Sequence, residues 1–228
     1  MPSPPIIFLE APASSPPAVK ICGVRSAQGF RDCNAAGADA IGINFYPPSK
    51  RYCPPEQARE WLPGLANACA ARVGVFVNAD RIEILKLIAA GCLDAAQLHG
   101  DESPEFCAAL ESDGVPVIKA VRVAHPGDLG KIAGFAGRYV LLDALLPGGG
   151  YGGEGVSFDW KIAADAVAAF PDKRILLAGG LTPANAAEAA RLVRPAALDT
   201  ASGVESAPGE KDTAKVRAFI AAAKSVAP

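Results

Sequence analysis

The stretch that decides the fold is residues 18–29, AVKICGVRSAQG, in which an apolar strand runs into a turn and then a helix. An open, doubly wound sheet that binds a dinucleotide carries a Gly-x-Gly-x-x-Gly turn after its first strand. The turn after Cys22 lacks this pattern. The stretch therefore favours a closed barrel, and the doubly wound sheet is the alternative.

The rest of the chain repeats the same alternation of strand and helix. Strands are predicted at residues 18–22, 40–45, 72–77, 95–99, 116–121, 139–143, 175–179 and 196–200. Helices are predicted at residues 26–36, 55–69, 80–90, 103–113, 126–134, 159–169, 183–193 and 212–224, several of them with start signals such as Asp80, Ser103 and Thr182-Pro183. Strict alternation implies parallel strands joined by helical crossovers. Eight such units predict an α/β fold of the single-domain (β/α)8 TIM barrel type.

The domain organisation is predicted to be one barrel over residues 19–228, preceded by a flexible N-terminal tail over residues 1–18. The tail holds six prolines and a single charged side chain, Glu10. It has neither the basic start nor the long apolar core of a signal peptide. We therefore expect a tail that contributes little to the core.

Composition narrows the class of partner. The chain has 22 Lys and Arg against 24 Asp and Glu, a net charge of -2, and no basic stripe. This balance favours a small-molecule partner and argues against nucleic acid or a membrane surface. Six cysteines without a Cys-x-x-Cys pair, and only two histidines, suggest neither a disulfide framework nor a metal site. A reducing cytoplasm fits this cysteine usage.

Candidate site residues lie where the predicted strands end, because a TIM barrel carries its active site at the C-terminal ends of its strands. Glycines after the last two strands let backbone amides approach an anion, and these loops are a frequent phosphate site of the fold. They predict phosphate binding by Gly179, Gly180, Ser202 and Gly203. Arg51 offers a guanidinium fork to a carboxylate, with a solvated surface charge as the alternative.

Asp143, the loop that follows it and His99 are also expected at this end of the barrel. Asp143 ends an apolar strand and is predicted to lie at a polar mouth or to cap the next loop. That loop has six glycines between Gly148 and Gly155, the composition of a mobile lid. His99 is expected to be a neutral, hydrogen-bonded histidine rather than a catalytic one.

A set of motifs, taken together, resembles one enzyme family. They are KICGVRSAQGFRDCNAAGADAIGINFYPPSKRY, VGVFVN, QLHGDESP, VLLDA, GGEGVSFDW, LAGGLTPANAAEAARLVRP and LDTASGVESAPGEKD. In this order they resemble phosphoribosylanthranilate isomerase of tryptophan biosynthesis, over residues 19–224. The resemblance implies an Amadori rearrangement of N-(5-phosphoribosyl)anthranilate without metal or organic cofactor, by a monomer or homodimer.

The resemblance also implies residue roles. Cys22 would be the general base that takes the C2 proton, and Asp143 the general acid that protonates the ring oxygen. Arg51 would bind the anthranilate carboxylate, while Gly180, Ser202 and Gly203 would hold the phosphate. Lys20 shares a strand face with Cys22, and we expect it to lower the pKa of that thiol. Glu154, Val156 and Ala201 depart from the family pattern, in the lid and in the phosphate loop.

Other functions stay open from the sequence. One is another phosphate-binding barrel, such as a sugar-phosphate isomerase or epimerase or indole-glycerol-phosphate synthase. A second is a Schiff-base aldolase built on Lys119, and a third is a catalytically silent binding barrel. A second substrate from a related isomerisation of the histidine pathway is also compatible with the chemistry.

Overall fold

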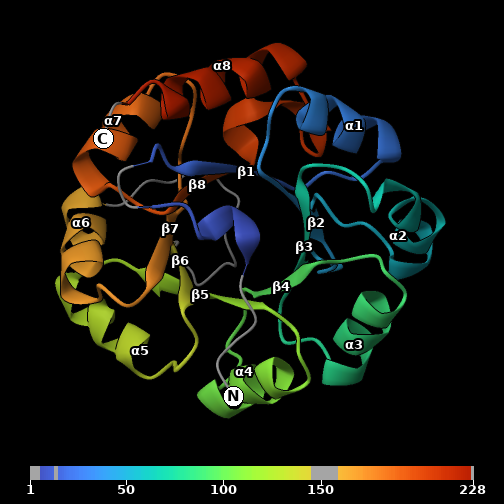
Figure 1. Ribbon diagram of the computed structural model, residues 1–228, viewed down its shortest axis with the longest axis horizontal. Helices are drawn as coiled ribbons and strands as arrows, with labels where there is room; N and C mark the ends of the chain where they lie inside the picture. The colour runs from blue at the N-terminus through green and yellow to red at the C-terminus, as the bar shows by residue number, and fades with distance from the viewer. Residues whose placement is uncertain (1–5, 13–14, 145–158, 227–228) are drawn as a thin grey trace.

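The protein is an eight-stranded parallel barrel surrounded by helices (Figure 1). A computed structural model describes residues 6–12, 15–144 and 159–226. The barrel closes in the order β1 to β8, with β1 hydrogen-bonded to both β2 and β8. This closed ring confirms the predicted TIM barrel and excludes the doubly wound sheet.

All eight predicted strands are present. They are β1 (Ala18–Cys22), β2 (Ala40–Asn44), β3 (Ala71–Phe76), β4 (Ala95–Leu98), β5 (Val117–Val123), β6 (Tyr139–Ala144), β7 (Arg174–Leu177) and β8 (Ala197–Thr200). Their runs of Val, Ile, Leu and Ala are buried on both faces, as expected of parallel strands covered by helices.

The predicted helices are also present, with the second, the fifth and the seventh shortened. They are α1 (Ala27–Ala35), α2 (Pro55–Trp61), α3 (Arg81–Ala89), α4 (Pro104–Ser112), α5 (Gly130–Ala133), α6 (Trp160–Ala169), α7 (Ala186–Val193) and α8 (Thr213–Lys224). The 3₁₀ turns η2 (Pro63–Leu65) and η3 (Pro126–Leu129) replace the end of the second predicted helix and the start of the fifth.

Side-chain caps explain where several helices begin. Asp80 and Ser103 accept hydrogen bonds from the backbone amides of Ile82 and Phe106, which confirms both as predicted start signals. The start predicted at Thr182-Pro183 is wrong. Asn185 accepts from the Thr182 amide at 2.7 Å and folds residues 182–185 into a turn, so α7 begins only at Ala186.

The barrel interior is filled at its lower end by one apolar cluster. Every strand contributes to it: Ala18, Ala40, Val73, Ala95, Ile118, Ala120, Tyr139, Leu141, Leu176, Ala178 and Ala197. The same cluster contains Ile6 and Leu9, from outside the barrel strands. The interior is therefore a packed core and not a pore.

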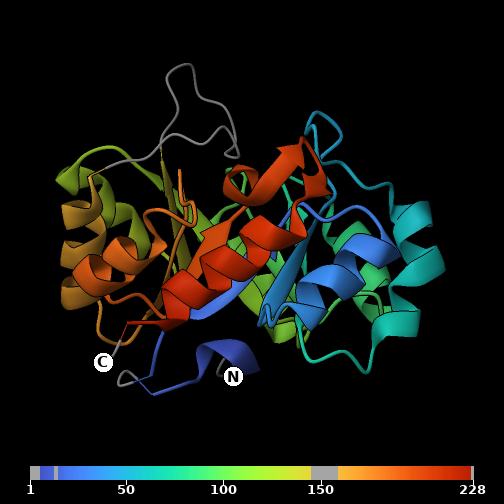
Figure 2. The same ribbon diagram turned by 90° about the horizontal axis from the view of Figure 1, so that it is seen from above.

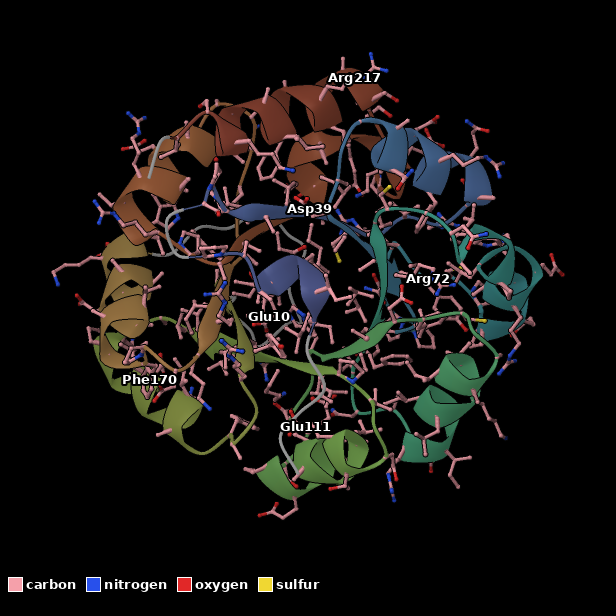
Figure 3. The ribbon with its side chains drawn as sticks, viewed as in Figure 1. Glu10, Asp39, Arg72, Glu111, Phe170 and Arg217 are labelled. Atoms are coloured by element: carbon pink, nitrogen blue, oxygen red, sulfur yellow. The ribbon has the colours of Figure 1, made fainter. Side chains whose placement is uncertain are left out.

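Ile6 and Leu9 belong to a short N-terminal segment that covers the lower end of the barrel. The turn η1 (Ile7–Leu9) lies across this end (Figures 1 and 2), and Leu9 is 0 % exposed. The Ile6 amide donates to the Tyr139 hydroxyl at 2.8 Å, and that hydroxyl donates to Glu10, which lies near the centre of the view in Figure 3. The sequence predicted a flexible tail here, whereas residues 6–12 are held against the barrel. The domain boundary at residue 18 stays a prediction.

Two features at the opposite end of the barrel were not predicted from the sequence. After β8 the chain forms the turn η4 (Ser202–Val204) and an antiparallel hairpin of β9 (Glu205–Ala207) and β10 (Glu210–Lys211). Figure 2 shows this hairpin at the end of the barrel away from η1.

Candidate active site

The inward-facing positions of the barrel become polar toward the C-terminal ends of the strands. They carry Lys20, Cys22, Gln97, His99, Arg122, Asp143 and Asp199. The alternation of side chains along each strand places these groups on the inner face, above the apolar cluster. The chemistry therefore concentrates at the end opposite η1.

Cys22 lies next to a buried ion pair. Lys20 is 0 % exposed, and its Nζ donates to Oδ1 of Asp199 at 2.8 Å. A Cβ atom built on Gly42 would lie 2.7 Å from Sγ of Cys22 and 3.2 Å from Nζ of Lys20. Both side chains thus fill the space left by the missing side chain at Gly42, and the thiol and the ammonium group are neighbours.

Burial has the largest effect on the Cys22 thiol. It raises the pKa of Cys22 above the ordinary value, with help from Asp199, while Lys20 and Lys211 act in the opposite direction. Burial alone would lower the pKa of Lys20, but Asp199 and Cys22 raise it. The predicted influence of Lys20 on the thiol has the expected direction, yet it does not outweigh burial.

Asp143 lies on β6, three strands from β1 around the ring by way of β8 and β7. It is buried, and its Oδ1 accepts a hydrogen bond from the Ala144 amide at 2.9 Å. Its Oδ2 lies 3.2 Å from Nε2 of His99. His99 is therefore hydrogen-bonded, as predicted, and its partner is a proposed catalytic residue.

Arg51 is not the solvated surface charge that the sequence left open, because it is only 9 % exposed. Its Nε and Nη2 atoms donate to the two carboxylate oxygens of Glu205, each at 2.7 Å. Lys211 donates to the same carboxylate at 2.7 Å and to the Ala201 carbonyl at 3.0 Å. The two cations hold the pKa of Glu205 below its ordinary value although burial acts to raise it.

Glu205 and Lys211 are functional-site residues that sequence reasoning missed. Both lie on the β9–β10 hairpin, which turns at Gly209 with a φ of +84°. The Pro208-Gly209 pair is a turn signal that would have indicated the hairpin. Glu205 also accepts from the Gly209 amide at 3.1 Å, so one carboxylate joins the turn, the hairpin and the loop after β2.

The two predicted phosphate loops lie against each other. Gly179 and Gly180 have φ values of +87° and +63°, a conformation that favours glycine. A Cβ on Gly203 would lie 1.9 Å from the Leu181 carbonyl oxygen, so only glycine permits this approach. Thr200 donates its hydroxyl to the same oxygen at 2.8 Å. The loops after β7 and β8 therefore form one surface, and their binding of phosphate stays a prediction.

Other predicted features are placed differently. Lys119 donates to the carbonyls of Leu98 and Gly100 and to Glu102 at 2.8 Å, so its three ammonium hydrogens are engaged, which argues against an aldolase lysine. The predicted lid, with Glu154 and Val156, lies outside the described residues. Within residues 6–12, 15–144 and 159–226, no group of three or more His, Cys, Asp or Glu could hold a metal ion.

None of the helices that the structure describes combines the length and the apolar character needed to cross a membrane.

Comparison with known proteins agrees with this architecture. Residues 19–222 match the family described as N-(5'-phosphoribosyl)anthranilate (PRA) isomerase. The N-(5'-phosphoribosyl)anthranilate isomerase of Myxococcus xanthus is 46 % identical, over 91 % of this chain and 96 % of that protein. The enzyme of Geobacter metallireducens is 48 % identical, over 91 % and 98 %.

Solved structures show the same likeness. Phosphoribosyl anthranilate isomerase from Thermotoga maritima superposes with a TM-score of 0.79 at 38 % identity, over 92 % of this chain and 100 % of that chain. A phosphoribosyl anthranilate isomerase in complex with reduced 1-(o-carboxyphenylamino)-1-deoxyribulose 5-phosphate superposes with a TM-score of 0.78 at 37 % identity, over 92 % and 100 %. With most of its length matched and nearly half of its residues identical to these relatives, the chain belongs to the phosphoribosylanthranilate isomerase family.

Proposed function

We propose that this chain converts N-(5-phosphoribosyl)anthranilate into 1-(2-carboxyphenylamino)-1-deoxyribulose 5-phosphate, in tryptophan biosynthesis. One observation carries the proposal within the family. Cys22 and Asp143 occupy inward positions at the same end of the barrel, on strands three steps apart. An acid and a base on opposite sides of the mouth can act on two different atoms of one bound sugar.

The reaction needs two proton transfers. Asp143 gives its proton to the ring oxygen, the bond from that oxygen to C1 breaks, and a Schiff base forms. Cys22 as thiolate then removes the C2 proton, and the resulting enolamine tautomerises to the ketone of the product. Proton transfer by positioned side chains contributes about 10²- to 10⁴-fold to such a reaction.

Substrate binding is assigned to groups around these two residues. Arg51, which Glu205 holds through its Nε and Nη2 atoms, is the residue that would bind the anthranilate carboxylate. Gly179, Gly180, Ser202 and Gly203 would present backbone amides to the phosphate. Support for this comes from the positive φ values and the close contact of the two loops.

We place the reaction in the cytoplasm, as a monomer or homodimer without cofactor. All six cysteines are free thiols, which supports a reducing compartment. A relative supports both assembly states, since monomers have been generated from the dimeric phosphoribosylanthranilate isomerase of Thermotoga maritima.

The test is turnover of phosphoribosylanthranilate, followed as loss of its fluorescence. The wild-type chain should turn it over, and Cys22→Ala and Asp143→Asn should each lose at least about 100-fold in kcat. Cys33→Ala is the matched control, because Cys33 is a buried cysteine of α1 outside the mouth and should keep full activity.

Each outcome has a distinct meaning. A wild-type chain without turnover refutes the isomerase and leaves a silent barrel or another phosphate-binding enzyme. Turnover that survives in Cys22→Ala removes Cys22 as the base while the isomerase stands.

A further inference from the structure

Gln97, His99 and Asp143 form a chain of polar contacts inside the barrel that ends at the proposed general acid. Gln97 and His99 lie two residues apart on the inward side of β4 and its end. Nε2 of Gln97 lies 2.9 Å from Nδ1 of His99, and Nε2 of His99 lies 3.2 Å from Oδ2 of Asp143. The three residues are 1 %, 9 % and 5 % exposed, so water does not compete freely for these contacts.

The contact with Gln97 determines the tautomer of His99. The amide nitrogen of Gln97 has only hydrogens to offer, so Nδ1 of His99 accepts. A neutral imidazole that accepts at Nδ1 carries its hydrogen on Nε2. That hydrogen is then donated to the carboxyl group of Asp143.

The contacts of His99, and not the other end of the Gln97 amide, decide this orientation. Oε1 of Gln97 is buried and has no hydrogen-bond partner among the residues that the structure describes. If the amide were turned, its oxygen would face Nδ1 of His99, and a neutral imidazole would then carry its hydrogen on Nδ1. The lone pair of Nε2 would face the lone pairs of the Asp143 carboxylate, and that contact would be repulsive. For a neutral imidazole, only the observed orientation makes both contacts of His99 attractive when Asp143 is ionised.

We propose that His99 is a positioning residue that stabilises Asp143 as its proton leaves, and that Gln97 fixes the tautomer this requires. The inference rests on the proposed function. As the O–H bond of Asp143 breaks and the ring oxygen takes the proton, the electron pair stays on the carboxyl group. The Nε2–H of His99 and the backbone amide of Ala144 both donate to that group.

This arrangement acts on the rate rather than on substrate affinity. A hydrogen bond to an ionised carboxylate is stronger than one to a neutral acid. The contact with His99 therefore strengthens as charge develops on Asp143, and it lowers the barrier more than it stabilises the bound substrate. Its loss should appear in kcat and leave KM nearly unchanged.

Kinetics of two His99 variants test this step. His99→Leu removes the donor and should lower kcat by about 10- to 100-fold, with KM within about threefold, the range expected for a hydrogen bond to a charged group. His99→Gln keeps a donor near the Nε2 position and should recover most of the loss. His125→Leu is the control, because His125 lies outside the site and should leave kcat unchanged.

Nitrogen-15 NMR of histidine-labelled protein reads the tautomer without any turnover. The chain has two histidines, so His99 is assigned by the signals missing from His99→Leu. The wild type should show an unprotonated Nδ1 and a protonated Nε2. Gln97→Glu places an acceptor against Nδ1, so the Nδ1 signal should become that of a protonated nitrogen.

Three results would overturn the inference: a hydrogen on Nδ1 in the wild type, a kcat within threefold in His99→Leu, or equal loss in His99→Leu and His99→Gln. If His99→Leu does not fold, the His99→Gln rate and the NMR tautomer decide. A wild type that shows the Nε2–H tautomer without turnover refutes the isomerase and not the tautomer assignment.

Discussion

The segment that covers the lower end of the barrel is expected to stabilise the fold through Leu9. Leu9 is fully buried in the apolar cluster that all eight strands build, which also contains Ile118, Tyr139 and Leu141. Replacing a fully buried leucine by alanine typically costs about 2–5 kcal/mol of unfolding free energy. A segment so near the chain end can relax, so we expect Leu9→Ala to cost about 2–4 kcal/mol.

The assay is urea unfolding followed by circular dichroism, with Ile7→Ala as the matched control. Ile7 lies two residues away on the same turn but is 87 % exposed, and its replacement should change stability by less than about 0.5 kcal/mol. Both variants should keep the wild-type kcat and KM at 25 °C, because the proposed active site lies at the opposite end of the barrel. Equal, small losses for the two variants would refute the reasoning, since they would mean that the segment is not held against the barrel.

Three further predictions concern charge. Arg51→Lys should raise KM more than it lowers kcat, because lysine keeps the charge but loses the fork, and an unchanged KM would remove Arg51 from the substrate site. Lys20→Met, combined with Asp199→Leu to avoid an unpaired buried carboxylate, should test the lysine's effect on the thiol. Lys20 lowers the pKa of Cys22 more than Asp199 raises it, so the double variant should have a higher Cys22 pKa. The pH dependence of Cys22 alkylation measures this pKa, and an unchanged value would contradict the assigned influence of Lys20. Burial raises the pKa of three other thiols to about 11: Cys33, Cys53 and Cys107. Unfolded thiols lose their protons at lower pH, so the unfolded state binds fewer protons and stability should fall as pH rises from about 9 to 11. The urea midpoint of unfolding, measured across this pH range, checks the prediction. Cys33→Ala should make the midpoint fall less steeply with pH, whereas Cys69→Ala, at an exposed cysteine, should not. A midpoint that does not change with pH would contradict the prediction.

The barrel was predictable from sequence because each strand is an apolar run followed by a helix-forming segment. That pattern depends on local spacing alone, and it placed β1 at its observed bounds. The starts at Asp80 and Ser103 were predictable for the same reason, since a cap acts within three residues. The start of α7 was not, because Asn185 turns its side chain back to the preceding loop.

The covering segment, and the contact of the hairpin with Arg51, depend on distant parts of the chain. Ile6 and Leu9 have no periodic pattern around them, and only the open lower end of the barrel makes them core residues. Glu205 meets Arg51 across 154 positions of sequence, which no local signal reveals. Cys22, Arg51 and Asp143 were candidates because they lie at or after predicted strand ends, whereas their roles come from the family resemblance and stay predictions.

The cluster of Arg51, Glu205 and Lys211 restricts the order in which substitutions can accumulate at this mouth. Loss of Arg51 leaves Glu205 paired with Lys211, so the remaining charges still balance. Loss of Glu205 first removes the carboxylate that Arg51 and Lys211 share and leaves two like charges close together, and that intermediate is unfavourable. A change of substrate charge during evolution is therefore expected to begin with replacement of Arg51 and not with replacement of Glu205.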